Sequence, residues 1–339
     1  MHLFVTGEKD NMKLSIVSNK VLGKELAFPI YMDNGVMYLN SGVKLNEKYI
    51  KAIQNMKINM VYTNDGIDDI VLKEVLESRV KLKIIKILKQ EFNSIKVLKK
   101  VNDKVIKDII DELLLEVDLS ENALFFNNLG QMDDLTKLCI HSLEVCVLSI
   151  IVGVNKKLNE KKLINLAVAA LLHDVGKLFN PGEEHVIEGY NLLKKNYMFS
   201  AAAYVAILQH HEKVNGTGFP EKLKGNNIHE LAKIISICDG FLNALTNEGM
   251  LLHQAMEKVQ AETLRKYDEE TYKCFNKSIY LYPVGSEVKL NNGKVGTVIL
   301  QNKSFPIRPV IMVENNINRE YIDLNNKDNL TLFIEEVIL

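Results

Sequence analysis

The stretch ALLHDVGKL at residues 170–178 decides the fold, because an apolar run ends there in an adjacent histidine and aspartate. The run before the pair, LINLAVAALL at residues 163–172, is almost entirely apolar. A bilayer requires ~20 such residues, so this run is too short to span a membrane and predicts a buried helix instead. His173 and Asp174 are therefore expected at the end of a core helix.

More residues of the kinds that bind divalent metals lie on both sides of this pair. His141 lies on an earlier amphipathic segment, His185 and the doublet His210-His211 follow, and Asp239 ends the apolar run AKIISICD. Imidazoles and carboxylates of this kind hold two divalent cations around a shared carboxylate. The set therefore predicts a binuclear metal site, and hard cations in such a site suit phosphoester hydrolysis.

The adjacent positions of His173 and Asp174 suggest how the ligands divide. Side chains of neighbouring helical residues point about 100° apart, so the pair can serve one metal and a bridge between two, with Asp174 as the bridge. The expected ligands are His141, His173, Asp174 and Asp239 for the first metal, and Asp174, His185, His210 and His211 for the second. Water between two cations loses its proton near neutral pH, so a bridging hydroxide is the expected nucleophile.

Lys177 completes the predicted catalytic pair with Asp174. It lies four residues after His173 and is expected on the same helical face, where its ammonium group would stabilise charge on a phosphate oxygen.

Each part of the predicted metal site also has an ordinary structural explanation. A histidine next to an aspartate is often a surface pair, His210-His211 could be a solvated helix end, and Asp239 could finish a buried helix. The combined spacing favours the metal site.

Composition narrows the partners and the compartment. The 339 residues include 42 Lys+Arg and 43 Asp+Glu, so the net charge of -1 creates no general attraction to DNA, RNA or an anionic membrane. An anionic ligand must be recognised locally. Four cysteines without CxxC spacing predict reduced, half-buried thiols, with Cys139 and Cys146 in a core. No signal peptide is recognised, and a cytoplasmic location is expected.

The pattern along the chain predicts a mainly α protein with a small α/β module at the N-terminal end and a small all-β domain at the C-terminal end. No fold is predicted for residues 1–11. The expected regions are an α/β module at 12–66, a helical connector at 67–130 that packs on the catalytic core, a catalytic helical bundle at 131–272, and a β domain at 279–339. Asp33-Asn34-Gly35 and Asn292-Gly293 are the predicted hairpin turns.

Four motifs resemble the HD-GYP family, a branch of the HD-domain phosphohydrolases. They are HDVGK at 173–177, HVIEGYNLL at 185–193, QHHEKVNGTGFP at 209–220 and AKIISICD at 232–239. The resemblance covers about residues 131 to 250. It implies a helical HD-domain bundle with two divalent metals, iron or manganese, that hydrolyses cyclic di-GMP to pGpG or onward to GMP. The flanking modules resemble pieces found in clostridial-type members.

The segment after the histidine doublet is the predicted substrate-binding loop, together with Lys177. Gly216 and Gly218 permit backbone conformations closed to other residues, and Pro220 stiffens the exit. Phe219 stands where the family has a tyrosine, so it keeps a stacking face and lacks the hydroxyl.

Other departures from the family leave a second function open. The segment LFNPGEE before His185 is short, which predicts an open site, and Lys137 stands where some relatives carry a carboxylate for a third metal, which argues for two. Glu248 and Leu251 occupy positions where a phosphate-binding arginine and lysine are expected. The alternative to a hydrolase is therefore a catalytically weak module that binds a cyclic dinucleotide and signals through a homodimer or another protein partner.

Overall fold

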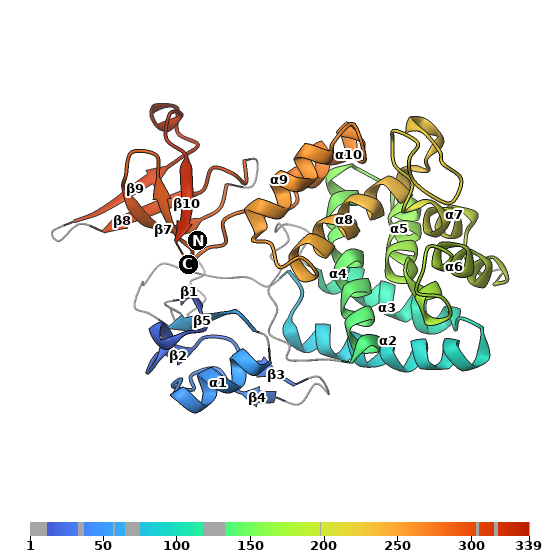
Figure 1. Ribbon diagram of the computed structural model, residues 1–339, viewed down its shortest axis with the longest axis horizontal. Coiled ribbons are helices and arrows are strands. Elements are labelled where there is room, and N and C mark those ends of the chain that lie inside the picture. Colours follow the sequence, from blue (N-terminus) through green and yellow to red (C-terminus); the bar gives the residue numbers. More distant parts are fainter. Residues whose placement is uncertain are drawn as a thin grey trace, which may run out of the picture. The chain divides into compact units, whose positions relative to one another are not determined.

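The computed structural model describes residues 12–32, 37–56, 58–64, 75–117, 133–196, 198–302, 305–314 and 318–338. The chain forms two compact units. One contains residues 1–73, 124–132 and 280–339, and the other contains residues 74–123 and 133–279. The predicted fold class is confirmed, because a helical bundle is accompanied by a small N-terminal α/β module and a C-terminal β-sheet (Figure 1).

The N-terminal module is built from short strands around one helix. Its three-stranded antiparallel sheet has the order β1-β5-β2, with β1 at Met12–Ile16, β5 at Met60–Asn64 and β2 at Glu25–Leu26. Strands β3 (Ile30–Tyr31) and β4 (Met37–Leu39) form an antiparallel pair, while the predicted turn at Asp33-Asn34-Gly35 lies outside the described residues. Helix α1 (Glu47–Asn55) starts at Asn46, whose side chain accepts a hydrogen bond from Tyr49 N.

The C-terminal segment forms a five-stranded antiparallel sheet with the order β10-β6-β7-β8-β9. The strands are β6 (Glu287–Leu290), β7 (Val295–Leu300), β8 (Val310–Glu314), β9 (Arg319–Asp323) and β10 (Ile334–Ile338). The predicted turn at Asn292-Gly293 joins β6 to β7, with Gly293 at φ +82°. Alternating burial along β6 explains why these residues form a one-sided sheet.

The two terminal modules contact each other within one unit. Tyr62 on β5 is buried and donates from its hydroxyl to Val284 O at 3.3 Å, and Lys13 on β1 pairs with Glu287 on β6 at 2.8 Å. Leu14 N also donates to Gly285 O. The sequence predicted these modules separately, and their boundaries stay predictions. Tyr62 also packs against Val284 and Ile299, so segments from both ends of the chain share a small apolar cluster.

The second unit is a bundle of helices. They are α2 (Ser78–Leu98), α3 (Asp103–Glu116), α4 (Asp134–Asn155), α5 (Glu160–Leu172), α6 (His185–Lys194), α7 (Ala201–Gln209), α8 (Glu230–Thr246), α9 (Leu252–Glu262) and α10 (Glu269–Asn276). Helix α4 packs on α5 and α8 at the centre, α7 packs on α5, α6 and α8, and α2 and α3 cover α4 and α5 as predicted for the connector (Figure 1).

Helices α4 and α5 supply much of the core. Helix α5 is buried without interruption from Leu166 to Leu172, in agreement with the predicted core helix. Helix α4 is long and apolar enough to cross a membrane by length and composition. However, 72% of its most apolar stretch is buried in the bundle, so a place in the core accounts for its apolar composition. Cys139 and Cys146 on α4 are buried thiols.

Candidate metal centre

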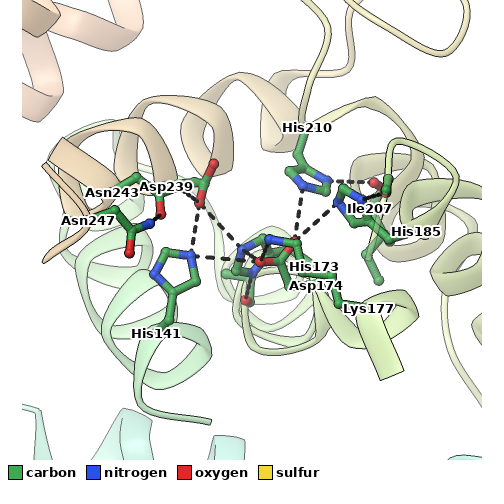
Figure 2. Close-up of polar contacts among 12 residues, drawn as sticks. His141, His173, Asp174, Lys177, His185, Ile207, His210, Asp239, Asn243 and Asn247 are labelled. Atoms are coloured by element: carbon green, nitrogen blue, oxygen red, sulfur yellow. Dashed lines mark hydrogen bonds and ion pairs between the residues drawn. The ribbon is translucent and has the colours of Figure 1, made fainter. Parts of the chain in front are cut away.

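The predicted ligands come together from five helices or their ends. His141 lies within α4 and Asp239 lies within α8, whereas His185 is the first residue of α6. The two doublets lie where helices end, with His173 as the C-cap of α5 and His210 as the C-cap of α7. The chain turns at these points, so both members of each doublet face one centre. Figure 2 shows the labelled rings directed towards Asp174 and Asp239.

The ligand atoms form two groups that share Asp174. The first ligand group is His141, His173, Asp174 and Asp239, and the second ligand group is Asp174, His185, His210 and His211. Within each group the candidate donor atoms all lie within 4.8 Å of one another. This is the division expected from the sequence. The spacing suits cations placed among the donor atoms, because ligand bonds of about 2 Å separate two ligands by roughly 3 to 4 Å.

The carboxylate of Asp174 has one oxygen directed to each group. Its Oδ2 lies 3.4 Å from His173 Nε2 and 3.9 Å from His141 Nε2. Its Oδ1 lies 3.2 Å from His185 Nε2 and 3.8 Å from His210 Nε2. A carboxylate with its two oxygens turned to different sets of imidazoles has the orientation of a bridging ligand.

Backbone carbonyls fix three of the imidazole rings. Nδ1 of His173, His185 and His210 lies 2.7–2.8 Å from the carbonyl oxygen three residues earlier, on Ala170, Gly182 and Ile207. A carbonyl oxygen can only accept, so each Nδ1 carries a proton and donates it. The lone pair is then on Nε2, which points into the centre. This is the tautomer that a metal-binding histidine needs.

The same atoms show that a cation fits the site. Among the described residues, Nε2 of His173, His185 and His210 and Oδ1 of Asp174 are buried without a hydrogen-bond partner. Buried polar atoms without partners are rare, because each one costs the free energy of its lost hydration. Four such atoms converge here, and all four are electron-pair donors. Divalent cations would satisfy them together.

Electrostatics agree with this donor set. Burial raises the pKa of Asp174, but the neighbouring imidazoles of His173, His185 and His210 outweigh it and hold that pKa well below its usual range. Asp239 has a lowered pKa for the same reason, through His141 and His173. Both carboxylates are therefore ionised, and they favour positive charge nearby.

The pKa values of two imidazoles, those of His173 and His211, are shifted in opposite directions. Burial lowers the pKa of His173, yet the carboxylates of Asp174 and Asp239 raise it to about 10, so without a cation Nε2 of His173 also holds a proton, which a bound cation would replace. His211 shows the opposite balance, since burial and the neighbouring His210 lower its pKa to about 2. His211 is therefore a neutral imidazole, as a ligand must be.

Lys177 contacts the carboxylate of Asp174 from a 3-10 helix, which the sequence did not predict. Helix α5 ends at Leu172, and residues Val175–Leu178 form the short 3-10 helix η2. Lys177 is therefore three residues along a tight turn from Asp174, and its Nζ lies 2.5 Å from Asp174 Oδ2. The expected shared helical face with His173 is wrong because the α-helix stops before the doublet. The ammonium group lies beside the centre, and the Lys177 side chain is 34% exposed.

The glycine-rich loop packs on the second ligand group. The ring of Phe219 stacks on His211, with ring centroids 4.8 Å apart and planes at 30°. A Cβ atom on Gly218 would lie 2.4 Å from Lys213 N, and Gly216 has φ +80°. These glycines therefore allow the loop to close on its own backbone. Pro220 follows Phe219 in a cis peptide bond.

Glu212 is a residue of the site that sequence reasoning missed. Its side chain is buried, and its two carboxylate oxygens accept hydrogen bonds from Glu221 N at 2.6 Å and Leu223 N at 2.9 Å. Glu212 directly follows His211, so these hydrogen bonds hold residues 221–223, on the far side of the loop, next to the second ligand group. A carboxylate directly after two ligands was a visible signal, but its partners are backbone groups that no side-chain pattern reveals.

The residues that depart from the family have local partners. Glu248 pairs with Lys258 on α9, with Nζ to oxygen distances of 2.5 and 2.7 Å, so its charge is compensated. Leu251 is the N-cap of α9. Lys137 is exposed and pairs with Asp134 at the start of α4, at 3.1 Å.

Comparison with known proteins shows which family this chain resembles. Residues 129–271 match the family model of the HD domain. Two curated relatives are the cyclic di-GMP phosphodiesterase PA4108 of Pseudomonas aeruginosa, 29% identical over 61% of this chain and 54% of the relative, and PdeB of Borreliella burgdorferi, 24% identical over 56% and 55%. These matches agree with the predicted resemblance to the HD-GYP family.

The extent of these similarities is partial. The chain spans about half the length of the curated relatives that it matches. Among solved structures, Bd1817, an HD-GYP protein from Bdellovibrio bacteriovorus, is 19% identical with a TM-score of 0.49, and the similarity covers 78% of this chain and 98% of that one.

Proposed function

We propose that this protein hydrolyses the phosphodiester bonds of cyclic di-GMP to pGpG, GMP or both, with two divalent metal ions, iron or manganese, in the HD-domain centre. The observation that carries the proposal is the convergence of buried, unpartnered electron-pair donors around the carboxylate of Asp174. Two curated relatives named as cyclic di-GMP phosphodiesterases support the choice of substrate.

The residues of the centre have distinct tasks in this reaction. Bound divalent cations would acidify water and stabilise negative charge on a phosphoryl oxygen. The backbone carbonyls behind His173, His185 and His210 hold the donor atoms in place before any cation binds. Lys177 supplies an ammonium group beside Asp174, where it can stabilise charge that develops on the phosphate.

The accessible side of the centre indicates where the phosphodiester approaches. His173, Asp174, His185 and His210 are buried, whereas His141 is 15% exposed and Lys177 is 34% exposed. His211 and Phe219 are also partly accessible. The substrate is therefore expected to meet the centre along these partly exposed side chains. Phe219, with one face on His211, lies where it can contact a nucleotide base.

The alternative of a weak signalling module loses part of its basis. It rested on the missing arginine and lysine at the positions of Glu248 and Leu251. Lys258 compensates the charge of Glu248, so repulsion of a phosphodiester by this carboxylate is reduced. The complete donor set favours the hydrolase.

The test is hydrolysis of cyclic di-GMP by the full chain loaded with Mn(II), with products separated by chromatography. We expect pGpG or GMP from the loaded protein and none after chelation. His210→Ala should abolish the product, whereas His253→Ala, a histidine of α9 outside both ligand groups, should not change it. Loaded protein that binds Mn(II) and leaves cyclic di-GMP intact would contradict the proposal.

A further inference from the structure

Asp239 has a hydrogen-bond partner outside the ligand set. Asn243 lies four residues later on α8, so one helical turn places both side chains on the same face. Asn243 Nδ2 donates to Asp239 Oδ1 at 2.7 Å, and the same oxygen lies 2.9 Å from His141 Nε2 (Figure 2). An ionised carboxylate only accepts, so Asn243 must present its NH2 group to Asp239.

Asn247 fixes that amide from its other end. Its Nδ2 donates to Asn243 Oδ1 at 2.7 Å, and its backbone N–H donates to Asn243 O at 2.9 Å as the C-cap of α8. Both polar ends of the Asn243 side chain are therefore engaged. The three side chains form one chain of hydrogen bonds from the metal centre to the exposed end of the helix (Figure 2).

We propose that Asn243 is a positioning residue for the first ligand group only. Its amide holds Asp239 Oδ1 towards His141 and also towards His173 Nε2, which lies 3.7 Å from that oxygen. The inference rests on the proposed function, because it takes Asp239 to be a ligand. Partners behind a ligand orient it and tune its basicity, and their loss typically lowers metal affinity about 10–100-fold.

The second ligand group is held in a different way. Nδ1 of His185 and His210 donates to backbone carbonyls, which substitution of Asn243 does not touch. Asp174 is shared, but among the described residues its contacts do not include Asn243. Substitution of Asn243 should therefore lower the affinity for only one of the two ions. A general disturbance of the bundle would lower the affinity for both.

Two substitutions isolate this role. Asn243→Leu removes both hydrogen bonds at similar size, and leucine favours helix more than asparagine does, so α8 is not weakened. Asn191→Leu, at an exposed position on α6, is the matched control.

The experiment is Mn(II) titration of the full metal-free chain, followed by electron paramagnetic resonance of free ions and of spin-coupled pairs. Wild type and Asn191→Leu should bind two ions and show the coupled signal. Asn243→Leu should weaken the binding of one ion about 10–100-fold and lose the coupled signal at limiting Mn(II). Thermal unfolding of the metal-free proteins should be alike.

The possible failures are distinguishable. Two unchanged affinities in Asn243→Leu would overturn the inference alone. Equal weakening of both ions would also overturn it, because the effect would then not be confined to the first ligand group. A wild-type protein that binds no Mn(II) would overturn the proposed function, and the inference with it.

Discussion

Replacement of Gly176 by alanine should detach His185 from the metal centre. Gly176 lies in η2 between Asp174 and Lys177, directly against the start of α6. A Cβ atom at this position would lie 1.9 Å from the carbonyl oxygen of His185 and 2.8 Å from Gly189 N. Both are backbone atoms of one helix, so no side-chain rotation can relieve the overlap.

The size of the displacement follows from these distances. Ordinary contact begins near 3.4 Å, so η2 and α6 must separate by about 1.5 Å around Gly176. Metal sites tolerate deviations of only about 0.2 Å in ligand distances. The present 3.2 Å between His185 Nε2 and Asp174 Oδ1 would therefore increase beyond what one cation can bridge. Overpacking of this kind typically also costs about 1–3 kcal/mol of stability.

The assay is Mn(II) affinity and stoichiometry by competition with a chromophoric chelator. Gly176→Ala should lose the ion of the second ligand group, with its affinity at least ~10-fold weaker, and should keep the ion of the first, because three of its four ligands, His141, His173 and Asp239, lie on other elements.

The matched control for this substitution is a second glycine close to His185. Gly182→Ala should bind as wild type, since its Cβ would meet only the side-chain oxygen of Asn180, at 3.2 Å. Two ions bound with wild-type affinity in Gly176→Ala would refute the argument that this close contact positions His185.

Four further results are expected. Asp174→Ala should lower the content of both metal ions together, measured by elemental analysis, because its two oxygens face both ligand groups; loss of only one ion would contradict a bridging role. Lys177→Ala should keep metal but lower turnover of cyclic di-GMP roughly 10²-fold, and full turnover would mean that the phosphate binds elsewhere. Phe219→Leu should raise the KM for cyclic di-GMP about tenfold with kcat little changed. Cyclic di-GMP should also displace a linear polynucleotide of equal charge, and equal affinities of the two at moderate salt would count against a dedicated pocket.

The secondary structure was predictable where burial is periodic along the chain. Residues 166–172 are buried because α5 packs on α3, α4, α7 and α8, and such a helix is apolar all round. Burial alternates along β6 and β7 because one face of the C-terminal sheet is covered. The contact of Tyr62 with Val284 was not predictable, since it joins residues 222 positions apart and depends on a fold that neither segment encodes locally.

The candidate site was predictable as a set of residue types and less so as a geometry. Imidazoles and carboxylates can be recognised in the sequence as possible metal ligands, and the structure brings all seven candidate ligands together. Their orientation depends on backbone carbonyls, such as Ala170 O behind His173, and on the point where α5 stops. Every residue has a carbonyl group, so nothing in the sequence marks the one that accepts. The same holds for Glu212, whose partners are backbone N–H groups.

Glu248 shows why charge is harder to interpret from sequence than ligand type. A histidine has an imidazole nitrogen that can bind metal in any surroundings. The effect of a carboxylate on a phosphodiester, in contrast, depends on whether a cation lies beside that carboxylate. Lys258 is ten residues away in the sequence and on another helix, yet its Nζ lies 2.5 Å from Glu248 Oε1. The pair is partly exposed and therefore adds little stability, but it compensates the carboxylate charge near the end of α8. Replacement of Glu248 by arginine alone would set two cations side by side and disrupt this pairing, so the missing arginine cannot be restored without changing Lys258 as well.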